Sequence, residues 1–143
     1  MLKYITVKYN TTPVKMETPE EVRHAMSVTI TDFVKNLGRI LPNGGGDDLL
    51  GVSMIFGRMS EKVIMEHVEK YVMPYNEQIN KRNLKFFKKN KKHIFKGVGE
   101  DKINEYSDFI TGNKITKKNI DAIWDYFDSM VALYELHESM TDS

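Results

Sequence analysis

Apolar residues recur at spacings of three and four along most of the chain, as is typical of helices that bury one face. The first such run comprises Val22, Met26, Ile30, Phe33, Leu37 and Leu41. It is preceded by Thr18-Pro19, where threonine can cap a helix and proline fits its first position. Pro42 follows the run directly and cannot continue a helix. The pattern therefore predicts a first helix over residues 18–41.

Asn43 and the three glycines that follow it predict a loop over residues 43–46, because glycine loses the most conformational freedom when it is ordered. Asp47-Asp48 can then start a short helix over residues 47–59. Its apolar residues are Leu49, Leu50, Val52, Met54, Ile55, Phe56 and Met59. They surround nearly the whole helix, which predicts a buried central element. A phosphate-binding loop is disfavoured here, since two carboxylates would occupy the place of the phosphate.

Further helices are predicted over residues 60–72, 75–87, 100–110 and 116–137. Ser60 and Thr116 can cap the first and the last of them, and Pro74 removes a backbone donor where the first one ends. No alternation of strands and helices supports a parallel sheet. We therefore expect an all-α fold, a compact bundle of five or six helices.

The N-terminal segment Tyr4–Tyr9 is rich in β-branched and aromatic residues and predicts either a short β-strand or an extended arm. No second strand of comparable strength follows it. We therefore expect the segment to pack on its own domain, with pairing to another molecule as the alternative. The expected organisation is a single helical domain over 1–143, with an arm at 1–16, the bundle at 17–137 and a tail at 138–143.

The composition fits one soluble globular domain, because 41% of the 143 residues are hydrophobic and 29% are charged. The absence of cysteine excludes disulfides, thiolate metal sites and cysteine nucleophiles. No apolar run approaches the roughly 20 residues that span a membrane. No apolar signal region is apparent near the N-terminus, so we expect an intracellular protein that is not secreted.

The net charge of +1 conceals three different blocks. Residues 1–80 carry a net charge of −1, residues 81–96 carry +8 and residues 97–143 carry −6. Two interpretations remain open. The basic and acidic blocks face each other inside the fold, or the basic block faces an anionic partner.

The candidate residues for binding a polyanion or another partner lie in the basic block. They are Lys81, Arg82, Lys85, Lys88, Lys89, Lys91, Lys92 and Lys96. Phe86, Phe87 and Phe95 between them can stack on exposed bases or anchor the segment in the core, and anchoring is favoured because exposed phenylalanine pairs are costly. A candidate acidic partner face is formed by Asp121, Asp125 and Asp128, whose spacing places them on one strip of the last helix.

No catalytic constellation is apparent. His24, His67, His93 and His137 lack the spacing of a zinc motif, and no serine lies in a nucleophile elbow. We therefore expect a protein that is not an enzyme, with no catalytic residue, no metal site, no cofactor and no small-molecule substrate.

A set of residues in the second half carries a resemblance to a known group of proteins. They are Pro74-Tyr75, Ile79, Arg82, Phe86-Phe87, Ile123-Trp124-Asp125-Tyr126-Phe127 and Leu133-Tyr134. Over residues 74–137 the chain resembles small helical proteins of the nucleocytoplasmic large DNA viruses, the giant-virus group. The resemblance implies an intracellular viral protein, such as a component of the virion or of the viral factory, and implies no activity.

The leading hypothesis is a non-enzymatic helical interaction protein, viral and associated with the virion or its assembly. A protein partner or self-association is expected, because the basic segment of one molecule complements the acidic segment of another. The alternative is a nucleic-acid-binding accessory protein that uses the Lys81–Lys96 block.

Overall fold

The computed structural model describes residues 3–7 and 10–141, with side chains from Met16 onward. Within these residues, six α-helices of ten residues or more form a bundle, so the predicted all-helical fold is confirmed. The helices are α1 (Pro19–Ile40), α2 (Gly45–Gly57), α3 (Glu61–Tyr71), the short α4 (Asn76–Asn80), α5 (Lys85–Ile94), α6 (Glu100–Thr111) and α7 (Lys117–Thr141), with a 3-10 turn η1 at Met73–Tyr75.

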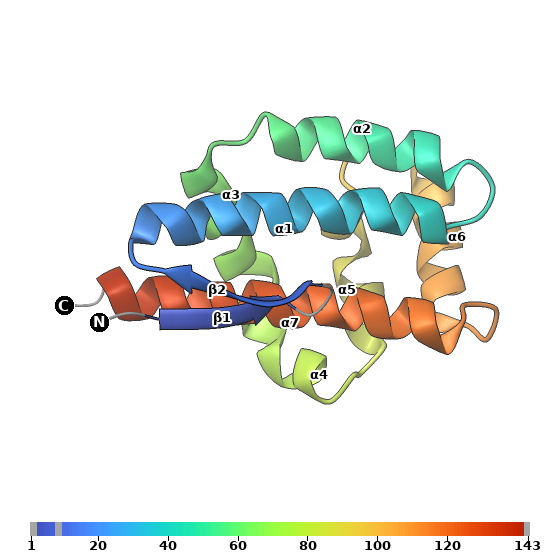
Figure 1. The fold of residues 1–143 in the computed structure, drawn as a ribbon. Coiled ribbons are helices and arrows are strands. Elements are labelled where there is room, and N and C mark those ends of the chain that lie inside the picture. Colours follow the sequence, from blue (N-terminus) through green and yellow to red (C-terminus); the bar gives the residue numbers. More distant parts are fainter. Residues whose placement is uncertain (1–2, 8–9, 142–143) are drawn as a thin grey trace.

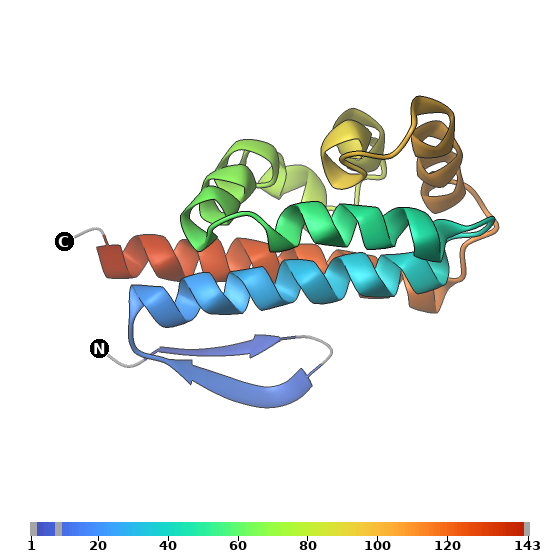
Figure 2. The ribbon, with the colours of Figure 1, turned by 90° about the horizontal axis from the view of Figure 1, so that it is seen from above.

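The helices are arranged in two layers. α1 lies between α2 and α7 and runs antiparallel to both (Figure 1). The helices α3 to α6 cover one side of this layer, and a β-hairpin lies on its other side (Figure 2). The core fills the space between the layers, and its largest fully buried side chains include Tyr106, Phe86, Phe87 and Phe95.

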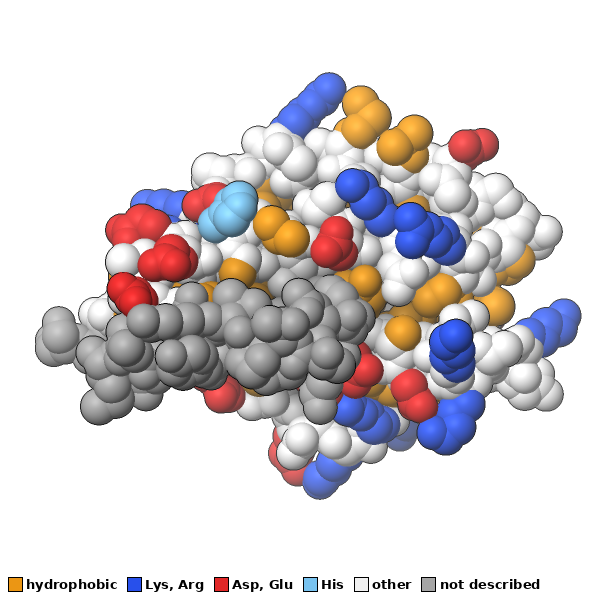
Figure 3. All heavy atoms as spheres, viewed as in Figure 1, with side chains coloured by type: hydrophobic (Ala, Val, Ile, Leu, Met, Phe, Trp, Pro, Cys, Tyr) orange, Lys and Arg blue, Asp and Glu red, His pale blue; other side chains and the backbone are white. Residues whose placement is uncertain are grey.

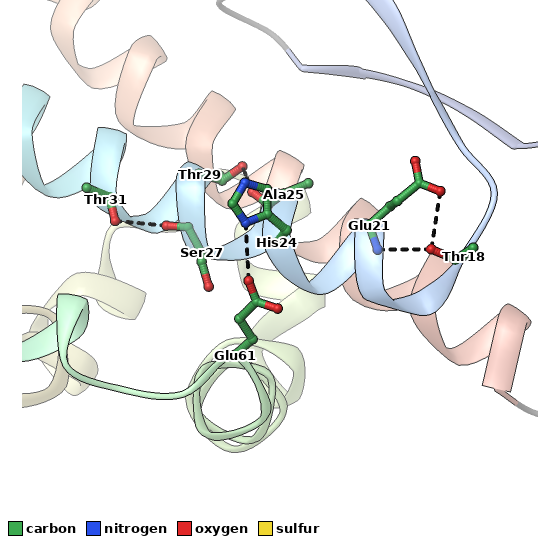
Figure 4. Close-up of polar contacts among 8 residues, drawn as sticks. All are labelled: Thr18, Glu21, His24, Ala25, Ser27, Thr29, Thr31 and Glu61. Carbon is green, nitrogen blue, oxygen red and sulfur yellow. Dashed lines mark hydrogen bonds and ion pairs between the residues drawn. The ribbon is translucent and has the colours of Figure 1, made fainter.

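The first helix begins and ends close to where its pattern predicts. The hydroxyl of Thr18 accepts a hydrogen bond from the backbone N–H of Glu21 at 3.2 Å (Figure 4), which satisfies one of the free N–H groups of the first turn. Every apolar residue of the predicted face is buried. Figure 4 also shows the imidazole of His24 beside the carboxylate of Glu61, 3.2 Å away, which connects α1 to α3.

The second helix differs from its prediction in two ways. It begins at Gly45, inside the predicted loop, and it lies at the surface, with Leu50 62% and Met54 53% exposed. Glycine allows the tight turn between α1 and α2, because a Cβ atom on Gly45 would lie 2.6 Å from the Cβ atom of Leu41, which follows α1 directly. The loop predicted over residues 43–46 is therefore confirmed at Asn43 and Gly44 only, since Gly45 and Gly46 are helical. The prediction of a buried central helix is wrong, because α1 holds the central position instead.

The N-terminal strand has a partner within the chain. Strand β1 (Lys3–Val7) pairs antiparallel with β2 (Asn10–Met16), with Ile5 opposite Val14. The expectation that no second strand follows is wrong, because β2 contains Pro13 and lacks a strong alternating pattern. Strand β1 lies against α7, so the hairpin packs on its own domain. Of the predicted segment Tyr4–Tyr9, Lys8 and Tyr9 lie outside the described residues.

The single helix predicted over residues 75–87 is divided into η1, α4 and α5. The break lies at Arg82, whose φ of 56° is in the left-handed region. The side-chain oxygen of Asn83 then accepts a hydrogen bond from the backbone N–H of Lys85 at 3.1 Å, where α5 begins. The prediction of one continuous helix is therefore wrong.

The last helix is longer than predicted. α7 continues to Thr141, so residues 138–141 of the predicted tail are helical, and 142–143 lie outside the described residues. The hydroxyl of Thr141 donates to the carbonyl of His137 at 3.0 Å, and Met140 packs partly against the core. These contacts extend the helix beyond the region of strong apolar periodicity.

Candidate functional site

Five lysines share one exposed face at and just beyond α5. They are Lys85, Lys88, Lys89, Lys92 and Lys96, and we call them the lysine face. Within α5 the spacings of three, one and three residues follow the helix repeat, so four of the ammonium groups are displayed on one side of the helix, and Lys96 is exposed two residues beyond its end. The α-carbons of Lys85 and Lys92 are separated by about 10 Å along the helix axis.

The opposite face of α5 is anchored in the core. Phe86, Phe87 and Phe95 are 1%, 2% and 1% exposed, which confirms the predicted anchoring. The alternative in which these rings stack on bases is therefore wrong. The ring centroid of Phe87 lies 4.7 Å from that of Trp124 on α7, and that of Phe86 lies 4.9 Å from that of Phe127. The lysine face thus belongs to a helix whose position is fixed by packing.

The other three cations of the basic block are engaged within the chain. The ammonium group of Lys81 donates to Glu77 at 2.7 Å, and that of Lys91 donates to the side-chain oxygen of Asn104 at 2.6 Å. The guanidinium of Arg82 donates to both carboxylate oxygens of Asp128. The structure therefore separates the eight candidate residues into three with partners in the chain and the five of the lysine face.

The acidic strip of α7 is partly neutralised by its own chain. Asp128 is paired with Arg82, and Asp121 is paired with Lys117, with 2.9 Å between nitrogen and oxygen. The hydrogen bond from Arg82 to Asp128 and the charges of all three aspartates raise the pKa of the Arg82 guanidinium. At this point the basic and acidic blocks face each other inside the fold, which was the first of the two open interpretations.

The positive charges of the lysine face are not paired with acidic side chains in this way. None of its members forms an ion pair with a carboxylate among residues 16–141. Like charges on one helix repel each other by a few tenths of a kcal/mol for each pair about one turn apart. An anionic ligand that spans the face removes this repulsion.

A stack of rings lies beside this face, between α3 and α5. The ring centroids of Tyr71 and His93 are 3.7 Å apart with an interplanar angle of 23°, and Tyr71 lies 4.7 Å from His67 on its own helix. Burial and the charges of Lys96 and His93 lower the pKa of His67 from 6.5 to about 4. Burial, Lys96 and Lys70 likewise lower the pKa of His93.

A small apolar cavity of about 40 Å³ lies beneath these rings. His67, Tyr71 and His93 line it on one side, and Phe33, Phe127 and Met130 are among the apolar residues that line it elsewhere. A volume of this size holds a few water molecules at most, so the cavity does not accommodate a cofactor.

The ring stack was missed in the sequence, because Tyr71 and His93 are far apart along the chain and belong to no common motif.

Over the part of the chain that the structure describes, no group of three His, Asp or Glu side chains is placed to hold a metal ion. Within the same residues, no helix combines the length and the apolar character needed to cross a membrane.

A second surface feature lies on α2. Large apolar side chains are exposed over this helix at the edge of the molecule (Figure 3). Leu50 and Met54 are four residues apart and therefore share the outer side of α2. Isolated apolar residues at the surface are common, and a pair on one helix face is a small patch.

Comparison with known proteins adds no relative. No protein-family model matches the chain, no curated protein sequence matches it, and no solved structure matches its fold.

Proposed function

We propose that this protein is a non-enzymatic nucleic-acid-binding protein whose lysine face binds the phosphate backbone. One observation carries the proposal. Five exposed lysines without ion-pair partners among the described residues share one side of a segment that is anchored by buried phenylalanines. Lysines that neutralise phosphates release condensed counterions, and this release favours binding without any choice of sequence.

The proposal makes the salt dependence quantitative. Each neutralised phosphate contributes about 0.7 to 0.9 to the slope of log affinity against log salt. Contacts from the whole face therefore give a slope of about −4 and a loss of affinity of about 250-fold between roughly 50 and 200 mM salt.

The decisive experiment is a salt titration of binding to labelled single- and double-stranded DNA and RNA. It compares the wild type with two variants that lose the same charge. The test variant replaces Lys85, Lys88, Lys89, Lys92 and Lys96 by glutamine. The matched control replaces the exposed lysines Lys35, Lys62, Lys114, Lys117 and Lys118 by glutamine.

We expect the test variant to lose binding and its salt slope, and the control to keep both. Equal losses in the two variants would show that net charge matters and the lysine face does not. Absence of wild-type binding at about 150 mM salt, with binding of an acidic protein instead, refutes the nucleic-acid assignment.

Protein interaction is the second candidate function, and the exposed pair Leu50 and Met54 on α2 favours it. Light scattering at low and high salt separates two modes of self-association. Assembly through the basic and acidic segments weakens as salt rises, whereas assembly through the apolar pair persists or strengthens. Replacement of Leu50 and Met54 by serine abolishes only the second mode.

The viral and intracellular setting is part of the same proposal. Its support is the resemblance of residues 74–137 to small helical proteins of nucleocytoplasmic large DNA viruses. A virion- or factory-associated protein meets viral nucleic acid and other viral proteins, so both candidate functions are compatible with that setting.

A further inference from the structure

The lysine face ends beside a column of rings that leads from the core to the surface. The buried ring of Phe56 lies 5.4 Å from His67, His67 lies 4.7 Å from Tyr71, and Tyr71 lies 3.7 Å from His93. Both Tyr71 and His93 are partly exposed. The inner rings therefore hold the outer ones in a fixed orientation.

His93 is the outermost ring of this column. Of the described aromatic rings, only Tyr71 stacks on it, with nearly parallel planes. A flat ring supported on one side and partly exposed presents a surface on which another flat ring can stack.

The charged groups around His93 are all cationic or neutral. The charge of Lys96 acts on it from the turn that follows α5, and that of Lys70 acts on it from α3, where the ammonium group lies 5.3 Å from the ring centroid of Tyr71. His67 and Tyr71 are the other titratable groups that α3 places beside it. No described carboxylate acts on His93, so the surroundings of the ring favour an anion.

We propose that the ring pair Tyr71–His93 is a base-stacking site, in which one unpaired base of a single-stranded nucleic acid stacks on His93 while its flanking phosphates contact Lys70 and Lys96. This inference rests on the proposed function, because phosphate binding by the lysine face places the strand next to the ring pair. Single strands expose the faces of their bases, whereas bases in a duplex are covered by their neighbours.

The phenylalanine rings within the basic block are not accessible for stacking. Phe86, Phe87 and Phe95 are buried, so no base reaches them. The Tyr71–His93 pair is flanked by cations on both helices that contribute to it, and this arrangement of rings and cations is typical of proteins that bind single strands. Stacking of one base increases affinity by roughly tenfold.

The test is a binding experiment by fluorescence anisotropy at about 100 mM salt. It compares a thymidine oligonucleotide of about 12 residues with an abasic oligonucleotide of the same length and with a duplex of that length. The abasic strand keeps every phosphate and removes every stacking partner. The comparison on the wild-type protein needs no variant and therefore does not depend on the folding of a variant.

We expect the wild type to bind the thymidine strand about tenfold more tightly than the abasic strand. His93→Ala should lose this preference and keep its affinity for the abasic strand, whereas His93→Phe should keep the preference because it retains a ring. The helical circular dichroism of both variants should match that of the wild type.

Two results overturn the inference, and they are distinguishable. Equal wild-type affinity for the thymidine and abasic strands, or for single strand and duplex, removes the stacking site and leaves phosphate binding by the lysine face intact. Absence of binding to all three ligands refutes the proposed function together with the stacking site.

Discussion

The guanidinium of Arg82 donates hydrogen bonds to both carboxylate oxygens of Asp128, at 2.8 and 2.7 Å. The same guanidinium lies 5.6 Å from the ring of Trp124 and donates a third hydrogen bond to the carbonyl of Ile79. The side chain of Arg82 therefore connects the turn between α4 and α5 to α7, while its backbone adopts the left-handed conformation that ends α4.

Two substitutions at Arg82 distinguish the contribution of the ion pair to stability from that of the left-handed backbone conformation. Arg82→Ala removes the pair and keeps a Cβ atom in the left-handed region, as in the wild type, so we expect a loss of about 1 kcal/mol in the free energy of unfolding from the pair alone. Arg82→Gly removes the same pair but tolerates the backbone, and it should cost less. Urea denaturation followed by circular dichroism measures both. A larger loss for the glycine variant contradicts this account.

The pH dependence of stability should depend on His67. Its pKa is about 4 in the folded protein and 6.5 in the unfolded chain, so the unfolded state binds more protons between these values. Stability is therefore full above pH 6.5 and falls as the pH is lowered toward 4. We expect His67 to contribute about 2 kcal/mol to this fall. In urea denaturation at neutral and acidic pH, His67→Phe should show a correspondingly smaller fall, and an unchanged fall refutes the assignment.

Two glycines of α2 should respond in opposite ways to alanine. A Cβ atom on Gly45 would lie 2.6 Å from the Cβ atom of Leu41, so Gly45→Ala should distort the turn between α1 and α2 and destabilise the protein by about 1–3 kcal/mol. A Cβ atom on Gly51 meets nothing within 4 Å, so Gly51→Ala should stabilise the helix by about 0.5–1 kcal/mol. The midpoints of thermal unfolding should move in opposite directions. Two shifts of the same sign contradict the close contact of Gly45 with Leu41.

Binding of nucleic acid should strengthen at lower pH through His93. Burial, Lys96 and Lys70 hold its pKa below the ordinary 6.5 in the free protein, and a bound phosphate offsets the two ammonium charges. The complex therefore takes up a proton that the free protein lacks, and affinity rises as the pH falls, by at most about tenfold per pH unit. Anisotropy titrations between neutral and mildly acidic pH test this expectation. The affinity of His93→Phe should depend less on pH than that of the wild type. If the two proteins show the same pH dependence, a group other than His93 takes up the proton.

Local signals predicted the parts of the fold that depend on neighbouring residues. The cap at Thr18 and the apolar face from Val22 to Leu37 are determined within one helix, and both were predicted. The basic block was predicted as eight residues, and its division into the five lysines of the lysine face and three engaged cations was not predicted, because Lys91 and Arg82 find their partners Asn104 and Asp128 in later helices. The burial of Phe86 and Phe87 follows from the cost of exposing two aromatic rings side by side.

The features that were missed depend on residues far apart in the chain. The break at Arg82 is held by Asp128, which lies 46 residues later. The packing of α2 on α1 brings Leu49 against Gly38, where an added Cβ atom would lie 3.2 Å from the Cβ atom of Leu49, and a glycine run by itself indicates a loop. The Tyr71–His93 pair joins two helices whose relative position is fixed by tertiary packing, so no local pattern reveals it.

The burial of Trp124 beneath α5 has a practical consequence. It is the single tryptophan of the chain, and its indole contacts Phe87 of α5 while the guanidinium of Arg82 lies near its ring. Its intrinsic emission therefore reports whether α5 is seated on α7, without any label. Detachment of the helix that carries the lysines exposes the indole to water and shifts its emission to longer wavelength, so one optical signal follows the integrity of the proposed binding surface.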